Sequence, residues 1–132
     1  MMKEISVKTS SRVELIDITH LVEKVVLESK IKSGLCIIYV PHTTAAVTIN
    51  ENADPSVRRD IIAKLNKVIP FDDNYAHLEG NAAAHIKASI IGPSETILVN
   101  GGSLVLGTWQ GIYFCEFDGP RNRKVMIKII EG

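Results

Sequence analysis

Apolar and polar residues alternate in two segments at the start of the chain, 5–7 and 13–18. A period of two predicts strands with one buried face, because successive side chains of a strand point to opposite faces. Ser10 and Ser11 stand between the segments and favour a turn, so we expect the chain to open with a hairpin. The continuous apolar run 35–40 is typical of a strand buried on both faces, and strand character resumes over 45–50.

Three segments instead place apolar residues at helical spacing: 19–32, 55–69 and 82–91. Thr19 can cap the first helix, and Gly34 should close it. Asp54 followed by Pro55 is a strong helix start, since the aspartate can cap and the proline lacks an N–H that needs a partner. Asn81 should cap the third helix, which Gly92 and Pro93 end.

The remainder of the chain has β character, over segments 96–99, 104–106, 112–117 and 124–130. Asn100-Gly101 is a hairpin signal, and these segments together predict an antiparallel meander. Roughly eight strands and three helices, unevenly segregated, indicate an α+β fold with a mostly antiparallel sheet or sandwich carrying the helices. We expect residues 1–132 to form a single domain, because no linker or repeat divides them.

Composition narrows the functional classes. The 132 residues carry 15 basic and 15 acidic side chains, and this zero net charge argues against a general nucleic-acid binder. No signal-peptide pattern and no apolar run of about 20 residues is present, so we expect a cytoplasmic protein without a membrane partner. Cys36 and Cys115 lie in apolar runs without a CxxC spacing and are predicted to be reduced core residues.

Polar residues that a core does not need gather in four places. The first segment, 41–52, holds His42 after a strand and Asn50 and Glu51 at the end of the next, although such residues can also satisfy turn backbone. The second segment reads HLEGNAAAHIKASIIG and holds His77, Glu79, Asn81 and His85. A mixed set of histidine and glutamate suits a divalent ion, Mg²⁺ or Zn²⁺, although the spacing matches no standard zinc motif and the alanines can simply pack on a sheet.

The other two places lie in the C-terminal third. LGTWQG, 106–111, presents the only tryptophan, Trp109, beside Gln110 in a glycine-flanked loop. Its ring should cover either a flat heterocycle or a neighbouring subunit. DGPRNR, 118–123, carries Arg121 and Arg123 on a tight turn, where forked donors can bind phosphate or carboxylate; a solvated hairpin tip is the alternative.

Three long blocks, PHTTAAVTINENADPSVRRDI, HLEGNAAAHIKASIIG and LGTWQGIYFCEFDGPRNR, resemble the signature blocks of the YjbQ family. The resemblance implies a compact α+β domain that assembles as a homotrimer, with a polar pocket near subunit boundaries. It also implies a secondary, weak thiamine-phosphate synthase, a transferase that joins a pyrimidine methyl pyrophosphate to a thiazole phosphate. The motif positions carried over are His42, Asn50, Glu51, Glu79, His85, Trp109, Gln110, Arg121 and Arg123, with His77 opening the second block.

These positions suggest distinct roles. The predicted catalytic residues are His42, Glu79 and His85. The predicted ligands of a metal ion are His42, His77 and His85. Ligand binding would fall to Asn50, Glu51, Asn81, Trp109, Gln110, Arg121 and Arg123, with the arginines and the helix start after Asn81 on phosphate oxygens. Two other functions fit the same residues: a metal-dependent hydrolase of a small phosphorylated metabolite, and a non-catalytic trimer that binds such a metabolite.

Overall fold

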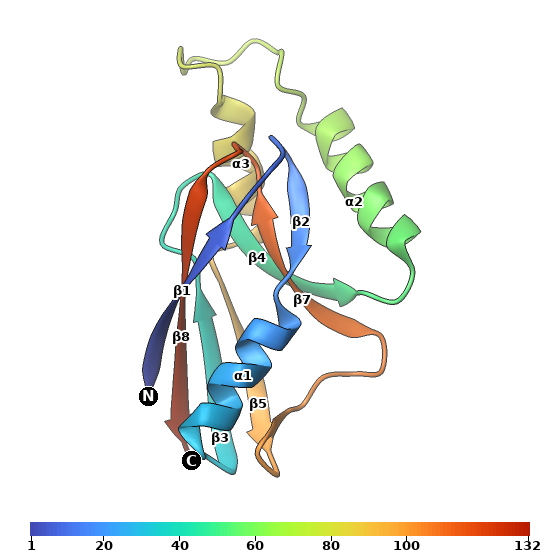
Figure 1. Cartoon of the computed structure of the whole chain (residues 1–132). Helices are drawn as coiled ribbons and strands as arrows, with labels where there is room; N and C mark the ends of the chain where they lie inside the picture. Colours follow the sequence, from blue (N-terminus) through green and yellow to red (C-terminus); the bar gives the residue numbers. More distant parts are fainter.

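The computed structural model describes all 132 residues and contains eight strands and three helices (Figure 1). The elements follow in the order β1 (Met2–Lys8), β2 (Glu14–Asp17), α1 (Thr19–Ser29), β3 (Ser33–Tyr39), β4 (Ala45–Glu51), α2 (Pro55–Val68), α3 (Ala82–Ile91), β5 (Ser94–Asn100), β6 (Ser103–Leu104), β7 (Gln110–Glu116) and β8 (Asn122–Glu131). All strand pairs are antiparallel, so the predicted α+β class is confirmed.

The strands divide between two sheets. Sheet A has the order β1-β8-β3-β5-β6, and sheet B has the order β2-β7-β4. The predicted opening hairpin is therefore wrong, because β1 pairs with β8 and β2 pairs with β7. The predicted C-terminal meander is also wrong beyond β5 and β6, which pair around Gly101 and Gly102 at positive φ. Long-range pairing in both sheets overrides the local order of the strands.

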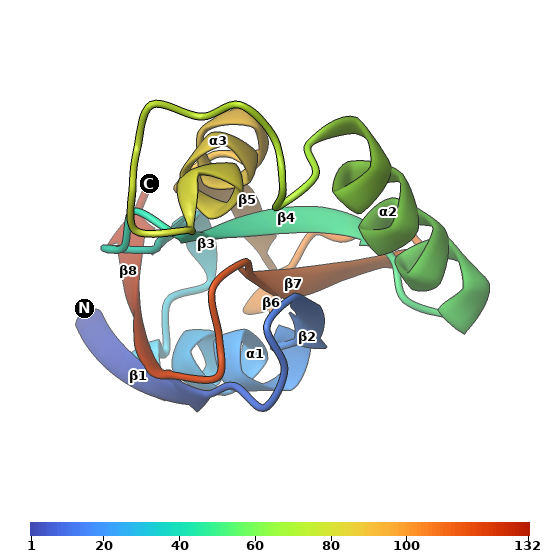
Figure 2. The ribbon, with the colours of Figure 1, turned by 90° about the horizontal axis from the view of Figure 1, so that it is seen from above.

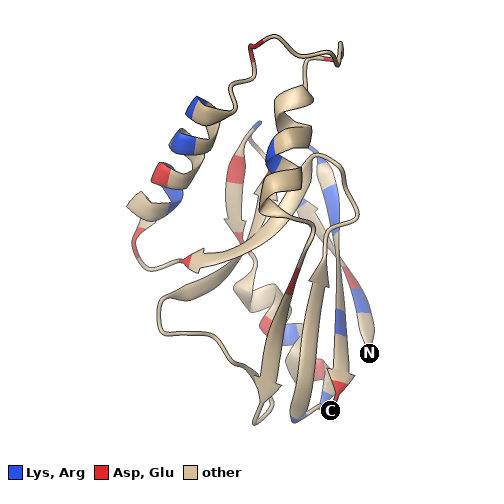
Figure 3. Cartoon of the chain, turned by 180° about the vertical axis from the view of Figure 1, so that it is seen from behind, with Lys and Arg blue, Asp and Glu red and all other residues tan.

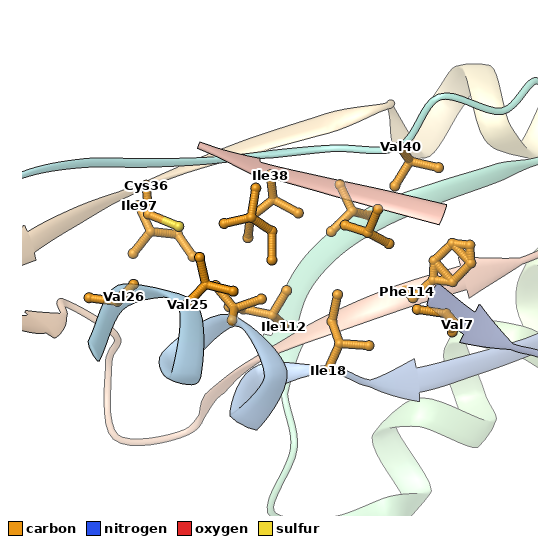
Figure 4. Close-up of a cluster of buried hydrophobic side chains, with 14 of the residues drawn as sticks. Val7, Ile18, Val25, Val26, Cys36, Ile38, Val40, Ile97, Ile112 and Phe114 are labelled. Atoms are coloured by element: carbon orange, nitrogen blue, oxygen red, sulfur yellow. The ribbon is translucent and has the colours of Figure 1, made fainter. Parts of the chain in front are cut away.

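The main core lies between α1 and the facing surfaces of the two sheets. Val22, Val25 and Val26 of α1 are buried against Cys36 and Ile38 of β3, as Figure 4 shows in part. Sheet B contributes residues from β4 and β7 to the same cluster. Both cysteines are buried and free, as predicted, and burial raises the pKa of the Cys36 thiol to about 11.

Sheet B is buried on both faces because α2 and α3 cover the side that faces away from α1. Ile112 and Phe114 of β7 point into the main core, whereas Tyr113 and Cys115 join a second cluster with Ala84 of α3. The strand at 35–40, in contrast, buries only alternate residues, so the prediction of burial on both faces is wrong for β3. Nothing in the chain covers the outer face of sheet A.

Local chemistry sets some helix boundaries but not all: Gly92 ends α3 as predicted, whereas the predicted Thr19 cap is wrong, because Thr19 is the first residue of α1 and Ile18 precedes it. Asp54 caps α2 as predicted, its carboxylate accepting the Ser56 amide at 2.9 Å. α1 ends earlier than predicted, at Ser29, because Lys30 adopts a left-handed conformation. Gly34 belongs to β3, where a Cβ atom would lie 1.8 Å from the Ile130 carbonyl oxygen, so close approach of two strands requires this glycine.

The chain ends and the helices fix the orientation of the molecule. Both termini lie at the lower end in Figure 1, whereas β8 and α3 begin at the upper end and β3 ends near the middle. From above, the 69–81 connection passes over the start of α3 (Figure 2). Basic and acidic residues are mixed along α2 and the strands (Figure 3). None of the helices has the length and apolar character that crossing a membrane requires.

Candidate functional site

A polar cavity of about 610 Å³ lies beside the start of α3. A volume of this size suits a small metabolite. Three stretches far apart in the sequence form its wall, namely the segment after β3, the start of α3 and the turn before β8. Its lining consists of Tyr39, Pro41, His42, Thr43, Thr44, Glu79, Asn81, His85, Asp118, Arg121 and Arg123.

The cavity brings together six of the residues predicted from the sequence: His42, Glu79, Asn81, His85, Arg121 and Arg123. His77 stands beside them, with its ring centroid 5.3 Å from that of His85 in an edge-to-face arrangement. The three alanines after Asn81 are buried, and Ala84 packs against β4 and β7 of sheet B, so small side chains bring the start of α3 close to the strands.

Asn81 links the second and fourth polar segments rather than capping the helix. Although it precedes α3, its side chain makes no capping bond, so its predicted capping role is wrong. Its Nδ2 donates to Asp118 at 2.9 Å, and its Oδ1 lies 2.9 Å from Nε2 of His77. Asp118 also accepts from Arg121 at 3.1 Å. These contacts form one continuous hydrogen-bond network, from His77 through Asn81 and Asp118 to Arg121.

A buried carboxylate supports the floor of the cavity. Glu116 is fully buried and accepts Nε and Nη2 of Arg123 at 2.9 and 2.5 Å. It also accepts the Thr9 hydroxyl at 2.7 Å and the Asp118 amide at 3.0 Å. Nη1 of Arg123 makes no hydrogen bond and is not enclosed, so this atom is the one available to a ligand.

Thr9 holds the turn that carries Arg121. Its hydroxyl accepts the Arg121 amide at 2.8 Å, and its own amide donates to the Arg121 carbonyl at 2.9 Å. Neither Thr9 nor Glu116 nor Asp118 was among the predicted site residues. The sequence could have indicated Glu116, because an acidic residue at the end of an apolar strand needs a cationic partner when it is buried. No sequence pattern indicates Thr9, which lies 107 residues from Glu116 in the sequence.

Hydrogen bonds decide the ionisation of the two acids. Burial opposes the charge of Glu116, but bonds from Arg123, Thr9 and the Asp118 amide outweigh it and lower the pKa. For Asp118, burial again opposes the charge, and bonds from Asn81 and Arg121 lower the pKa. Both carboxylates are therefore anionic at neutral pH, next to two guanidinium groups.

His42 is held by the backbone of β8. Its Nε2 atom accepts the amide of Lys124 at 2.9 Å, while no hydrogen bond reaches Nδ1, which is not enclosed. Burial lowers the pKa of His42, and the charge of Arg123 lowers it further, against a smaller opposing effect of Glu116. His42 is consequently a neutral imidazole at pH 7.

The remaining predicted residues lie elsewhere. Asn50 pairs with Gly111 and Glu51 with Gln110, at the end of β4 opposite to the cavity. Their side chains accept nearby amides: Asn50 that of Glu51, Glu51 that of Asp54, and Gln110 that of Gly107. Trp109 is 63% exposed on the adjoining turn and lines no part of the cavity. Within one chain the side chains of Asn50, Glu51 and Gln110 satisfy turn backbone, and none of the four residues joins the predicted site.

Within one chain the histidines do not form a metal-binding cluster. No group of three or more histidine, cysteine, aspartate or glutamate side chains is close enough to hold one. The predicted set of His42, His77 and His85 is therefore not assembled, and two of these rings already use Nε2 in hydrogen bonds. The cavity within one chain is a hydrogen-bonding and ion-pairing site.

Two further hollows differ in chemistry from the cavity. One, of about 410 Å³, adjoins the far side of His85 and is lined mainly by apolar groups of Tyr75, Ala76, Ala82 and Ile86, together with His77. The other, of about 470 Å³, runs between α1 and the β5–β6 turn, contains His20 and has no arginine. Only the first of these adjoins the polar cavity, with His85 between them.

Comparison with known proteins places the chain in a family. The sequence model described as "UPF0047 protein YjbQ-like" matches residues 3–132. UPF0047 protein MJ1081 of Methanocaldococcus jannaschii is 55% identical over 98% of this chain and 94% of its own length. UPF0047 protein YugU of Bacillus subtilis is 52% identical, over 98% of this chain and 99% of its own.

Solved structures agree with the sequence comparisons. A YjbQ/UPF0047 protein of Clostridium acetobutylicum is 58% identical and superposes with a TM-score of 0.96 over 97% of this chain and 99% of its own. A Sulfolobus solfataricus protein, described as of unknown function, is 37% identical with a TM-score of 0.96 over 100% and 97% of the two chains. Sequence and structure therefore agree that this chain belongs to the YjbQ/UPF0047 family.

Proposed function

We propose that the polar cavity binds a pyrophosphate ester and that the protein is a secondary thiamine-phosphate synthase. The observation that carries this proposal is the convergence of His42, His85, Arg121 and Arg123 from distant segments on one cavity, together with two carboxylates. A structural role alone does not require this convergence, because polar residues at unrelated turns have no reason to face one another. The YjbQ family resemblance supplies the particular reaction.

In this reaction the thiazole nitrogen attacks the methylene of the pyrimidine substrate. A C–N bond forms, the C–O bond to pyrophosphate breaks, and pyrophosphate leaves with the bonding electrons. Positive charge grows on the methylene and negative charge on the leaving group, so the transition state carries both signs. A lining that holds both guanidinium and carboxylate groups suits such a transition state better than a purely cationic lining would.

The geometry suggests how the groups are used. Arg121 and the free Nη1 of Arg123 would bind pyrophosphate oxygens. Glu79, on the same wall, would lie near the developing positive charge. The pyrimidine ring would occupy the apolar hollow beyond His85, rather than stack on Trp109, which lies at the other end of sheet B.

A trimer is part of the same proposal. Leu35, Leu98 and Ile130 are cross-strand neighbours on the outer face of sheet A, and they are 37%, 60% and 40% exposed. Contiguous apolar surface of this kind favours contact with another protein surface. A second copy seated there would cover it, and static light scattering of the purified protein measures the assembly.

Turnover separates the synthase from the other two functions. The purified protein is incubated with each thiamine precursor alone and then with both. Product that requires both substrates supports the synthase, whereas release of phosphate from a single compound supports a hydrolase. Binding without turnover, insensitive to chelators, supports a metabolite-binding protein and contradicts the synthase.

Arg121→Ala tests the site itself. We expect weaker binding of inorganic pyrophosphate in calorimetric titration, by about tenfold or more, because a charge-assisted hydrogen bond is lost. The exposed Arg59 provides a matched control, since Arg59→Ala removes the same charge at a position on α2 outside the cavity. Equal affinities in the two variants would argue against pyrophosphate binding by Arg121.

A further inference from the structure

The hydrogen bonds at the cavity rim assign opposite tautomers to two histidines. Nε2 of His42 lies 2.9 Å from the amide nitrogen of Lys124, and that amide can only donate. Nε2 of His42 must therefore carry a lone pair. In a neutral imidazole the single proton then lies on Nδ1, which makes no bond within the chain and is not enclosed.

The same reasoning gives the reverse result for His77. Asn81 donates from Nδ2 to the carboxylate of Asp118, which can only accept at neutral pH. The other end of the amide, Oδ1, therefore faces Nε2 of His77 at 2.9 Å. An amide oxygen only accepts, so Nε2 of His77 carries a proton. In the neutral ring the lone pair of His77 is on Nδ1.

We propose that the Lys124 amide fixes His42 as the Nδ1–H tautomer, so that His42 serves as a neutral hydrogen-bond donor to the anionic group of the ligand. A lone pair for metal binding or proton abstraction is absent from the free nitrogen of this ring. Of the two histidines that line the cavity, only His85 then remains for those roles. This inference rests on the proposed function for the nature of the ligand, but the tautomer itself does not depend on it.

Charge at the rim is consistent with a neutral donor. Burial of His42 disfavours a second proton on its ring, and so do the nearby charges of Arg123 and Lys124. The negative charge of Glu116 acts in the opposite direction. A protonated ring would also place an N–H of His42 against the N–H of Lys124. A donor without a charge adds selectivity for an acceptor atom without adding to the cationic charge of the wall.

Nuclear magnetic resonance tests the tautomer directly. Long-range proton–nitrogen correlation of the ¹⁵N-labelled protein shows which ring nitrogen carries the proton in each histidine. We expect Nδ1–H for His42 and Nε2–H for His77, so each ring serves as the reference for the other in one spectrum. A proton on Nε2 of His42 would overturn the proposal, whether or not any ligand binds.

Two substitutions test the donor role, with inorganic pyrophosphate as the probe. The amide of asparagine occupies nearly the position of Nδ1 of histidine, and the amide of glutamine that of Nε2. His42→Asn should keep pyrophosphate affinity within about threefold, whereas His42→Gln should keep the Lys124 contact but weaken affinity about tenfold or more. The reverse order, or equal losses, would refute donation from Nδ1.

The same titrations separate the two proposals. If the unmodified protein binds no pyrophosphate in any assay, the proposed function fails, while the spectrum still decides the tautomer. If it binds pyrophosphate and the spectrum shows Nε2–H at His42, the proposed function stands and this inference fails.

Discussion

Lys87 on α3 should lower the stability of the protein at neutral pH, in a way that a pH series can measure. Its side chain is fully buried, with Nζ bonded to Asn66 at 2.5 Å and 4.1 Å from the centre of the Phe71 ring. No carboxylate pairs with it. Arg12 stacks on the same ring at 3.6 Å. Burial, and then the charge of Arg12, lower the pKa of Lys87 to about 8.

The magnitude follows from linkage between proton binding and folding. The folded pKa of about 8 lies below the ordinary value of 10.5, so between these values the unfolded chain binds more protons than the folded one. The free energy of unfolding therefore rises with pH across this interval. At about 1.4 kcal/mol per pKa unit, the whole effect is on the order of 3 kcal/mol, and about 2 kcal/mol of it falls between pH 7 and pH 9.5.

Lys87→Met isolates this contribution, because methionine keeps the length of the side chain without its charge. Urea unfolding followed by circular dichroism gives the free energy of unfolding at pH 7 and at pH 9.5, at one protein concentration. The free energy for the unmodified protein minus that for Lys87→Met should increase by about 2 kcal/mol between the two pH values. Titration of all other groups cancels in this difference.

Lys64 provides the control, since it is an exposed lysine on α2. Lys64→Met removes the same charge, and its free energy of unfolding should follow the unmodified protein across the pH range. Parallel pH dependence in the unmodified protein and Lys87→Met would refute the reasoning. It would mean that the ammonium of Lys87 is solvated or compensated in the folded state.

Three further outcomes follow from the structure. Glu116→Gln should destabilise the fold by about 3–5 kcal/mol, because it leaves the buried guanidinium of Arg123 without its partner. Folding lowers the pKa of Glu116, so the stability that its carboxylate contributes should be lost as the pH falls below about 4.3. The difference in free energy of unfolding between the unmodified protein and Glu116→Gln should therefore shrink below that pH. Leu98→Lys should reduce the mass measured by light scattering, whereas Leu27→Lys, exposed on α1, should not; an unchanged assembly would contradict a contact through sheet A. Ala84→Leu should cost about 1–3 kcal/mol by overpacking α3 against sheet B, while exposed Ala63→Leu should be tolerated, as thermal unfolding would show.

Local chemistry allowed much of the fold to be predicted. The Asp54-Pro55 pair begins α2, and the glycines after Asn100 form the predicted hairpin turn. In both cases neighbouring residues supply the decisive interaction, so the sequence alone suffices. The family blocks pointed to the polar segments, and six of the predicted residues do line one cavity.

Strand pairing was beyond local reasoning. β1 pairs with β8 rather than with its neighbour β2, because burying the apolar faces of α1 and of both sheets at once requires contacts between distant segments. The predicted capping role of Asn81 was wrong for the same reason, because its side chain donates a hydrogen bond to the distant Asp118 instead of capping its own helix.

The sequence by itself determined the helices with strong starting signals, the reduced cysteines and the chemical types gathered in the polar segments. Only the tertiary structure decided which of those residues meet. It separated Trp109, Gln110, Asn50 and Glu51 from the histidines, since they lie at the opposite end of β4 and β7. It also gave His42 its partner, because the Lys124 amide is 82 residues away and only the folded sheet brings it within hydrogen-bonding distance.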